Sequence, residues 1–340
     1  MFFFSQVFTK AFSLISQFRY NGAMGRFVFL FVDGVGMGDE SEHNPFYAGR
    51  ARHLPFFGKR QHLPDGTPVE AIDARLGVAG VPQSATGQAT LFSGRNAAAA
   101  CGQHRGSYPD PLLRRLIWEQ NLLSAMAQSG LRGVYLNAYP FHAALFTSEH
   151  LRCLRSGKLW FSPAFPAVFR RRISVTTCML LASGQRPKDE KDIAGRRALY
   201  QDYSNRALIQ QGAALPEFSP EEAAAILAAA AQNVDLILYE YFQTDLCAHR
   251  RLPEECLALI GELDRLLAGL LSLLDPGCDT LLLTSDHGNL EDMRSRGHTL
   301  NPVPLLAWGK HGPLLRRRIS SIADVTPTIL EAVPINNSRR

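Results

Sequence analysis

Leu281 to His298 carry the sequence LLLTSDHGNLEDMRSRGH, in which an apolar run gives way abruptly to polar side chains. The run itself has the length and composition of a buried strand. Asp286 and His287 follow it directly, and a second imidazole, His298, lies beyond a polar loop. Because side chains at the carboxyl end of a parallel strand face the crevice where α/β proteins bind ligands, the stretch indicates a ligand site. An Asp-His pair alone is more often an ordinary turn, so the prediction depends on the other strand ends.

Two other predicted strands are followed by side chains of the same kind. Phe27–Val32 is a continuous apolar run that ends in Asp33 and then in glycines at alternate positions. We expect these glycines to let the backbone turn sharply beside something bulky or charged. The strand predicted at 234–239 is followed by Asp245 and His249, which one helical turn would place on one face.

The predicted strand ends together supply oxygen and nitrogen ligands without thiolates. A short helix that begins near Ser84 and stops at Gly94 adds a hydroxyl group. Such a set suits two divalent cations such as Zn, Mn or Mg, and without metal its converging carboxylates would raise one another's pKa. Two cations about 3.5–4 Å apart form a clamp for in-line displacement at phosphorus. The predicted ligands are Asp33, Ser84, Asp245, His249, Asp286, His287 and His298.

Alternating strands and helices predict an α/β fold, a three-layer sandwich with a mostly parallel central sheet and a small inserted cap. The predicted core comprises residues 24–96 and 231–335, and residues 97–230 form the predicted cap and substrate region. Helices are expected at 111–129, 220–232 and 253–274, and further strands at 133–137, 280–284 and 303–308.

Composition narrows the classes of function. The 340 residues carry a modest net charge of +5, and no basic run alternates with aromatic residues as in a nucleic-acid groove, so no nucleic-acid partner is expected. The six cysteines form no C-x-x-C pair, which predicts reduced packing thiols and a cytoplasmic protein.

Residues 1–23 are interpreted as an N-terminal extension. Gln6, Lys10 and Gln17 interrupt its apolar run, so it is not expected to span a membrane. Its phenylalanines fall at helical spacing, and a helix on a membrane surface or docked on the body remains open, as does synthesis from Met24.

Five short motifs follow one another along the chain: Val32-Asp33-Gly34, Ser84-Ala85-Thr86-Gly87-Gln88, Thr244-Asp245 with His249, Ser285-Asp286-His287-Gly288-Asn289, and His298-Thr299-Leu300-Asn301-Pro302-Val303-Pro304. In their kind and order they resemble the alkaline phosphatase superfamily, and within it the branch of cofactor-independent phosphoglycerate mutase and phosphopentomutase. The resemblance covers residues 26–95 and 234–332. It implies that Asp33, Ser84, Asp286 and His287 hold one cation and that Asp245, His249 and His298 hold the other.

The same resemblance implies an enzyme that transfers a phosphoryl group through Ser84. Ser84 rather than Thr86 matches the family's nucleophile, because it stands three residues before Gly87. The chain has Gln88 where the mutase has a histidine, and its cap segment is shorter, which favours hydrolysis of a phosphate ester. A phosphomutase remains the alternative enzyme, and a non-catalytic metal-bound binding protein the alternative of another class. The sulfatase pattern C/S-x-P-x-R is absent from the segment around Ser84.

The resemblance implies a small phosphorylated substrate as the partner. The sequence fixes neither the identity of that substrate nor the oligomeric state of the protein. Asn44, Arg95, His104 and Arg105 are candidate substrate contacts, because they lie near the predicted ligands or carry groups suited to phosphate or carboxylate. For each of them a structural role in a turn or at a helix end is an open alternative.

Overall fold

The computed structural model describes residues 25–58, 61–140 and 143–333, so the predicted N-terminal extension lies outside the described residues. Its central sheet has seven strands in the order β2-β3-β9-β8-β1-β7-β4. Strands β8, β1, β7 and β4 run parallel, whereas β9, β3 and β2 join at one edge through antiparallel pairs. The strands are β1 (Phe27–Val32), β2 (Gln61–His62), β3 (Pro68–Ile72), β4 (Gly133–Tyr135), β7 (Leu236–Tyr241), β8 (Thr280–Thr284) and β9 (Val303–Gly309).

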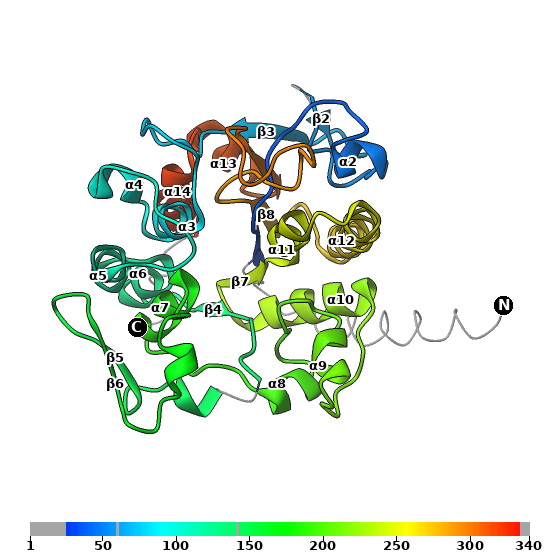
Figure 1. Cartoon of the computed structure of the whole chain (residues 1–340). Helices are drawn as coiled ribbons and strands as arrows, with labels where there is room; N and C mark the ends of the chain where they lie inside the picture. Colours follow the sequence, from blue (N-terminus) through cyan, green and yellow to red (C-terminus); the bar gives the residue numbers. More distant parts are fainter. Residues whose placement is uncertain (1–24, 59–60, 141–142, 334–340) are drawn as a thin grey trace.

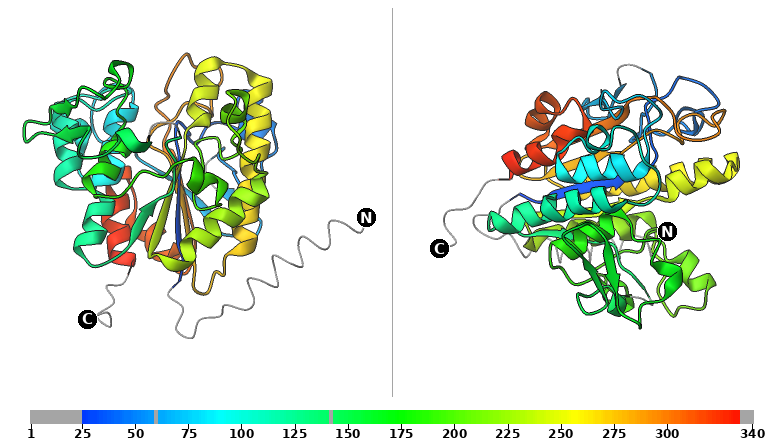
Figure 2. Two further views of the ribbon diagram at one scale, coloured as in Figure 1. Left: turned by 90° about the horizontal axis from the view of Figure 1, so that it is seen from below. Right: turned by 60° about the vertical axis from the view of Figure 1, so that its left-hand side comes forward.

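Helices cover both faces of this sheet, as Figure 2 shows in its left view. Alternate side chains of β1 enter two separate cores, because successive residues of a strand point to opposite faces. Phe27, Phe29 and Phe31 pack in the core with α3 (Ser84–Ser93), α4 (Ala97–Cys101), α5 (Pro111–Glu119), α6 (Leu122–Gln128), α7 (Val175–Ala182), α13 (Gly312–Arg318) and α14 (Val325–Ala332). Val28, Leu30 and Val32 pack in the core with α2 (Pro45–Ala48), α8 (Glu190–Ala194), α9 (Arg206–Gln210), α10 (Pro220–Ala230), α11 (Gln243–Arg250) and α12 (Pro253–Leu273). The predicted three-layer α/β sandwich is confirmed.

The chain between α6 and α10 forms most of the irregular structure, including a separate hairpin of β5 (Leu151–Cys153) and β6 (Leu159–Phe161). In Figure 1 this hairpin, α8 and α9 lie below the level of β4. Both β4 and α10 lie within the range 97–230, yet β4 is a strand of the main sheet and α10 packs in its core. The domain limits drawn from the sequence stay a prediction.

Two predicted features differ from the structure. The single helix expected at 111–129 is divided into α5 and α6, because Asn121 caps the second helix by accepting from Ser124 N at 2.9 Å and donates to Ile117 O. The prediction that all six cysteines are reduced is wrong for one pair, since Cys247 and Cys256 form a disulfide between α11 and α12. The cytoplasmic location that rested on reduced thiols stays a prediction. Within the described ranges, no helix combines the length and the apolar character needed to cross a membrane.

Candidate metal centre

The structure brings the seven predicted ligand side chains together at the carboxyl ends of three neighbouring strands. Parallel pairing aligns Val32 with Tyr241 and Phe31 with Thr284, so the segments that follow β1, β7 and β8 leave the sheet at one edge. Asp33 follows β1, Asp286 and His287 follow β8, and α11 after β7 carries Asp245 and His249. Ser84 is the first residue of α3, and His298 lies in the loop before β9.

One group of ligand atoms comes from Asp33, Asp286 and His287, whose nearest donor atoms all lie within 4.8 Å of one another. His287 Nε2 is 3.5 Å from an oxygen of each carboxylate and 3.0 Å from Ser84 Oγ. Asp33 Oδ1 and Asp286 Oδ2 are buried and have no hydrogen-bond partner among the described residues. Because a buried, unpaired carboxylate oxygen is costly, a divalent cation fits this group.

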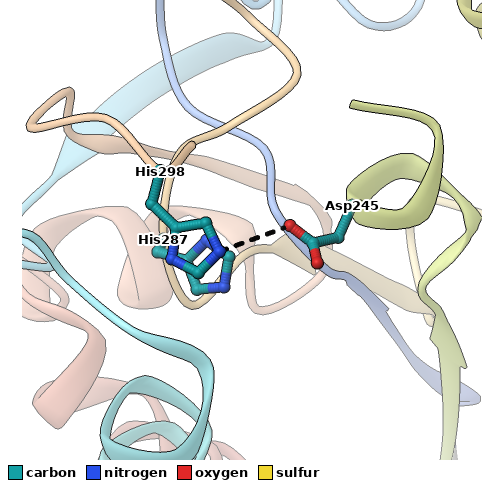
Figure 3. Close-up of side chains that lie close together, drawn as sticks. All are labelled: Asp245, His287 and His298. Carbon is teal, nitrogen blue, oxygen red and sulfur yellow. Dashed lines mark ion pairs between the residues drawn. The ribbon is translucent and has the colours of Figure 1, made fainter. Parts of the chain in front are cut away.

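A second group consists of Asp245, His287 and His298 (Figure 3). His298 Nε2 lies 3.7 Å from Asp245 Oδ1, and the two imidazole rings stack with their centroids 3.7 Å apart. His249 contacts the other oxygen of Asp245 at 3.3 Å and is half-exposed. His287 therefore lies next to both groups, whereas His249 joins the second one through Asp245.

The backbone around the two inner histidines fixes which ring nitrogen faces the site. His298 Nδ1 lies 2.9 Å from Pro82 O, and His287 Nδ1 lies 3.3 Å from Gly288 O. A carbonyl oxygen only accepts, so both Nδ1 atoms carry the hydrogen and both Nε2 atoms present a lone pair. His298 Nε2 and Asp245 Oδ1 are 3.7 Å apart, and both then present lone pairs with no hydrogen between them. A cation bound by both atoms would stabilise this arrangement.

Burial and mutual repulsion act on the carboxylates as expected for two of the three. Burial, together with the charges of Asp286 and Asp245, raises the pKa of Asp33 well above its usual range. Burial raises the pKa of Asp286 to about 6, with the charge of Asp245 adding to the effect. The prediction is wrong for Asp245, whose pKa falls to about 2. Burial raises it, but hydrogen bonds with His249 and Asn289 and the nearby His287 outweigh that effect.

The glycines after β1 make room for acidic side chains, which confirms their predicted role. Gly34 has φ +67°, and a Cβ there would overlap Asp245 Oδ1; a Cβ at Gly36 would overlap the carboxylate of Glu291. Glu291 is buried and accepts hydrogen bonds from Gly36 N, Asn289 N, Thr299 Oγ1 and Asn301 Nδ2. It therefore ties the segment after β1 to the loop that carries His287 and His298.

A cavity of about 620 Å³ opens beside the ligands, and side chains not predicted from the sequence line it. Gln88 Nε2 donates to Asp33 Oδ2 at 3.2 Å. Glu240, near the end of β7, is buried and accepts from Tyr135 Oη. Burial raises the pKa of Glu240 to about 7, against the effect of hydrogen bonds with Tyr135 and Thr176. An acid inside an otherwise apolar strand is the one sequence signal that could have marked Glu240.

The four candidate substrate contacts are not among the residues that line this cavity. Asn44 is buried, caps α2 and donates to Asp39 O and Phe56 O. Arg95 is exposed, 3.7 Å from Glu119. His104 precedes Arg105, which pairs with Asp110, and both backbone groups of Arg105 hydrogen-bond Thr86. The open alternative of a structural role fits Asn44 and Arg105, while the neighbouring Ser107 and Tyr108 do line the cavity.

Residues 203–337 match the family model described as "Metalloenzyme superfamily". Similar curated proteins are 2,3-bisphosphoglycerate-independent phosphoglycerate mutases. The one from Rhodopseudomonas palustris is 30% identical over 35% of this chain and 25% of its own length. The one from Dinoroseobacter shibae is 35% identical over 34% of this chain and 24% of its own length. The chain thus spans about a quarter of the length of these relatives.

Among solved structures, a mutant of the TAB5 alkaline phosphatase with Mg bound superimposes on 92% of this chain and 98% of its own, with a TM-score of 0.50 and 10% sequence identity. That likeness concerns the fold. The family match, for its part, implies divalent metal ions. Residues 203–337 thus match the metalloenzyme superfamily, while the chain shares the fold of the alkaline phosphatases and local sequence similarity with the cofactor-independent phosphoglycerate mutases.

Proposed function

We propose that the chain is a metal-dependent phosphoryl-transfer enzyme that hydrolyses phosphate esters through a phosphoserine at Ser84. The observation that carries this proposal is the place of the Ser84 hydroxyl. It lies 3.0 Å from His287 Nε2, at the first turn of α3, beside two buried carboxylate oxygens that lack hydrogen-bond partners. A hydroxyl in such a position is poised for nucleophilic attack once cations occupy the carboxylates.

The residues present would hold two divalent ions, of Mn, Zn or Mg. Asp33, Ser84, Asp286 and His287 are the proposed ligands of one, and Asp245, His249 and His298 those of the other. Bound there, the ions would supply positive charge that stabilises the attacking and leaving oxygens. The buried position of His287 beside both groups supports a pair of ions at short separation.

The chain itself would position the nucleophile and its surroundings. Ser84 begins α3, and the unpaired N–H groups of the first turn favour negative charge on its oxygen. The Ser84 oxygen would bond to phosphorus as the alcohol leaves, and water would then release phosphate and restore the serine. Gln88 would hold Asp33 in place through its hydrogen bond to Oδ2. Thr86 would take no part in this reaction, because its hydroxyl bonds to Gln83 O and Arg105 N.

The test uses the full chain loaded with Mn or Zn and p-nitrophenyl phosphate as substrate. We expect Ser84→Ala to lower kcat by about 10³-fold or more while metal content is retained. The control is Ser129→Ala, an exposed serine at the end of α6, which should act like wild type. Mass spectrometry of acid-quenched protein should find phosphate on Ser84.

Three outcomes would contradict the proposal. Full activity in Ser84→Ala would show that Ser84 is not the nucleophile. Absence of turnover in the wild type, with ligand binding unchanged in Ser84→Ala, would favour a binding protein. Transfer of labelled phosphate to a second position of a phosphorylated sugar or sugar acid, without release to solution, would replace hydrolysis by phosphomutase activity.

A further inference from the structure

The cavity beside the predicted metal ligands extends well beyond them. Its volume of about 620 Å³ exceeds what a phosphate group fills, so a second part of the substrate has room there. Besides the ligands, the ends of β4 and β7 and helix α7 contribute to its wall. This part of the wall carries hydroxyl, amide and carboxyl groups, from Tyr135, Asn137, Tyr139, Thr176, Thr177 and Glu240.

We propose that this wall binds the alcohol part of a phosphate ester and selects alcohols bearing hydroxyl or amine groups over alcohols bearing a carboxylate. The inference rests on the proposed function, because it assigns the substrate class of the same site. It would make Glu240 a specificity-determining residue, with Tyr135 and Asn137 as its positioning residues.

Hydrogen bonds hold Glu240 in a fixed position. Asn137 lies just past the end of β4, and its side chain donates to Glu240 O at 2.7 Å and accepts from Glu240 N at 2.9 Å. Tyr135 Oη donates to Glu240 Oε2, and the Tyr135 ring is itself buried. An acid fixed in this way can discriminate between ligands, since it cannot swing away from an unfavourable group.

Glu240 has no cationic partner among the residues that the structure describes. No ion pair with Lys, Arg or His involves it, although its side chain is almost fully buried. Asp33 and Asp245, the other acids of the cavity, belong to the proposed metal ligands. Glu240 is therefore the acid left to face the alcohol part, and a hydroxyl or ammonium group there would add a donor to those of Tyr135 and Thr176.

The remaining charges of the cavity do not favour a substrate carboxylate. Arg172 is the one Lys or Arg side chain among the described lining residues, and it is exposed. The hydroxyl groups of Ser174, Thr177 and Tyr200 both donate and accept, which suits a polyol. A substrate carboxylate near Glu240 would be repelled by a like charge in a medium of low dielectric constant. The exposed Arg172 is the one Lys or Arg side chain of the described lining that could attract it.

The test compares two esters that differ at one carbon. Glycerol 3-phosphate ends in CH₂OH where 3-phosphoglycerate ends in a carboxylate. With the metal-loaded wild type, we expect kcat/KM for glycerol 3-phosphate to exceed that for 3-phosphoglycerate by about tenfold or more. Phosphoethanolamine, which carries an amine, should also exceed 3-phosphoglycerate. In Glu240→Gln the preference should shrink to within about threefold, chiefly because KM for 3-phosphoglycerate falls.

Glu331→Gln on α14, an exposed acid paired with Arg318, is the matched control and should keep the wild-type ratio. Calorimetric binding of the two esters to metal-loaded Ser84→Ala gives a readout without turnover, and should show the same order of affinity.

Equal or better use of 3-phosphoglycerate by the wild type would overturn the inference, as would an unchanged ratio in a folded Glu240→Gln. If both esters bind in the expected order but none is hydrolysed by the wild type, the proposed hydrolysis fails while the inferred selectivity stands. If neither ester binds, both fail.

Discussion

Ser84 Oγ lies 3.0 Å from His287 Nε2, although 203 positions separate the two residues along the chain. Ser84 comes from a helix of one outer layer, and His287 from the loop after the central strand β8. The contact therefore depends on how that loop is held against the sheet. Changes in the residues that hold it should alter the site even though they touch no substrate.

Replacement of Glu291 by glutamine tests this dependence. The Glu291 carboxylate accepts from two backbone N–H groups, at 2.7 Å from Gly36 N and 2.8 Å from Asn289 N. An amide NH₂ placed against such donors would leave a buried group unpaired, at a cost of about 1–3 kcal/mol in the free energy of unfolding. We also expect metal affinity to fall by about 10–100-fold. Denaturant unfolding and metal titration measure the two effects. Glu70→Gln, an exposed position on β3, is the control, and equal behaviour of the two variants would refute the proposed role of Glu291.

Gly36→Ala tests the close approach of the backbone to the same acid. A methyl group at Gly36 would overlap the Glu291 carboxylate, so the chain must shift locally. We expect a loss of about 1–3 kcal/mol in stability, by the cost of overpacking a buried site. Gly261→Ala in the exposed part of α12 meets no atom within 4 Å and should instead raise stability by about 0.5–1 kcal/mol. Thermal unfolding of both variants compares them directly. A Gly36→Ala protein as stable as wild type would show that this contact is absent in solution.

The metal-free protein should respond to pH through Asp286. Burial raises the pKa of its carboxyl to about 6, whereas an unfolded Asp titrates near pH 3.9. The folded chain thus keeps a proton that the unfolded chain has lost, and this group's contribution to stability falls as pH rises from about 4 to 6. The difference in Tm between metal-free wild type and Asp286→Asn measures that contribution together with its effect on the neighbouring Asp33. We expect the Tm of the wild type to fall relative to that of the variant over this interval.

Metal binding should show the opposite trend, because cation ligands must be ionised. We therefore expect the rise in Tm on adding Zn or Mn to be larger at pH 7.5 than at pH 5, with Asp33 adding to the effect through its own raised pKa. A metal-induced rise that is larger at pH 5 would contradict this reading of the carboxylates.

The strands that build the site were predictable, because a strand buried on both faces leaves an uninterrupted apolar run. The bounds of β1 and β8 match those expected, and β7 begins two residues later than predicted, at Leu236. Asp235, just before it, instead accepts from Arg132 N. Parallel pairing of these runs then dictates that Asp33 and Asp286 meet.

The rest of the site depends on long-range packing that residue types do not encode. Glu291 stands in a polar loop, where an acidic residue is ordinarily exposed and gives no sequence signal. In the structure it is buried, because the glycines after β1 leave room for its side chain. Tyr135 looked like an ordinary strand residue until β4 paired with β7 and brought its hydroxyl to Glu240. For Asn44 the sequence predicted a function that the structure does not support. Its proximity in sequence to Asp33 suggested a substrate contact, but its side chain caps helix α2.

The central claim is that separate strand ends assemble a site for two divalent cations, and metal stoichiometry tests it most directly. The purified chain is loaded with Zn or Mn, desalted and analysed by mass spectrometry for metal per chain, beside Asp245→Asn and Asp286→Asn. We expect two ions in the wild type and about one in each variant, because each variant loses a carboxylate of a different group. Wild-type protein that retains no metal, or variants that retain as much as wild type, would contradict it.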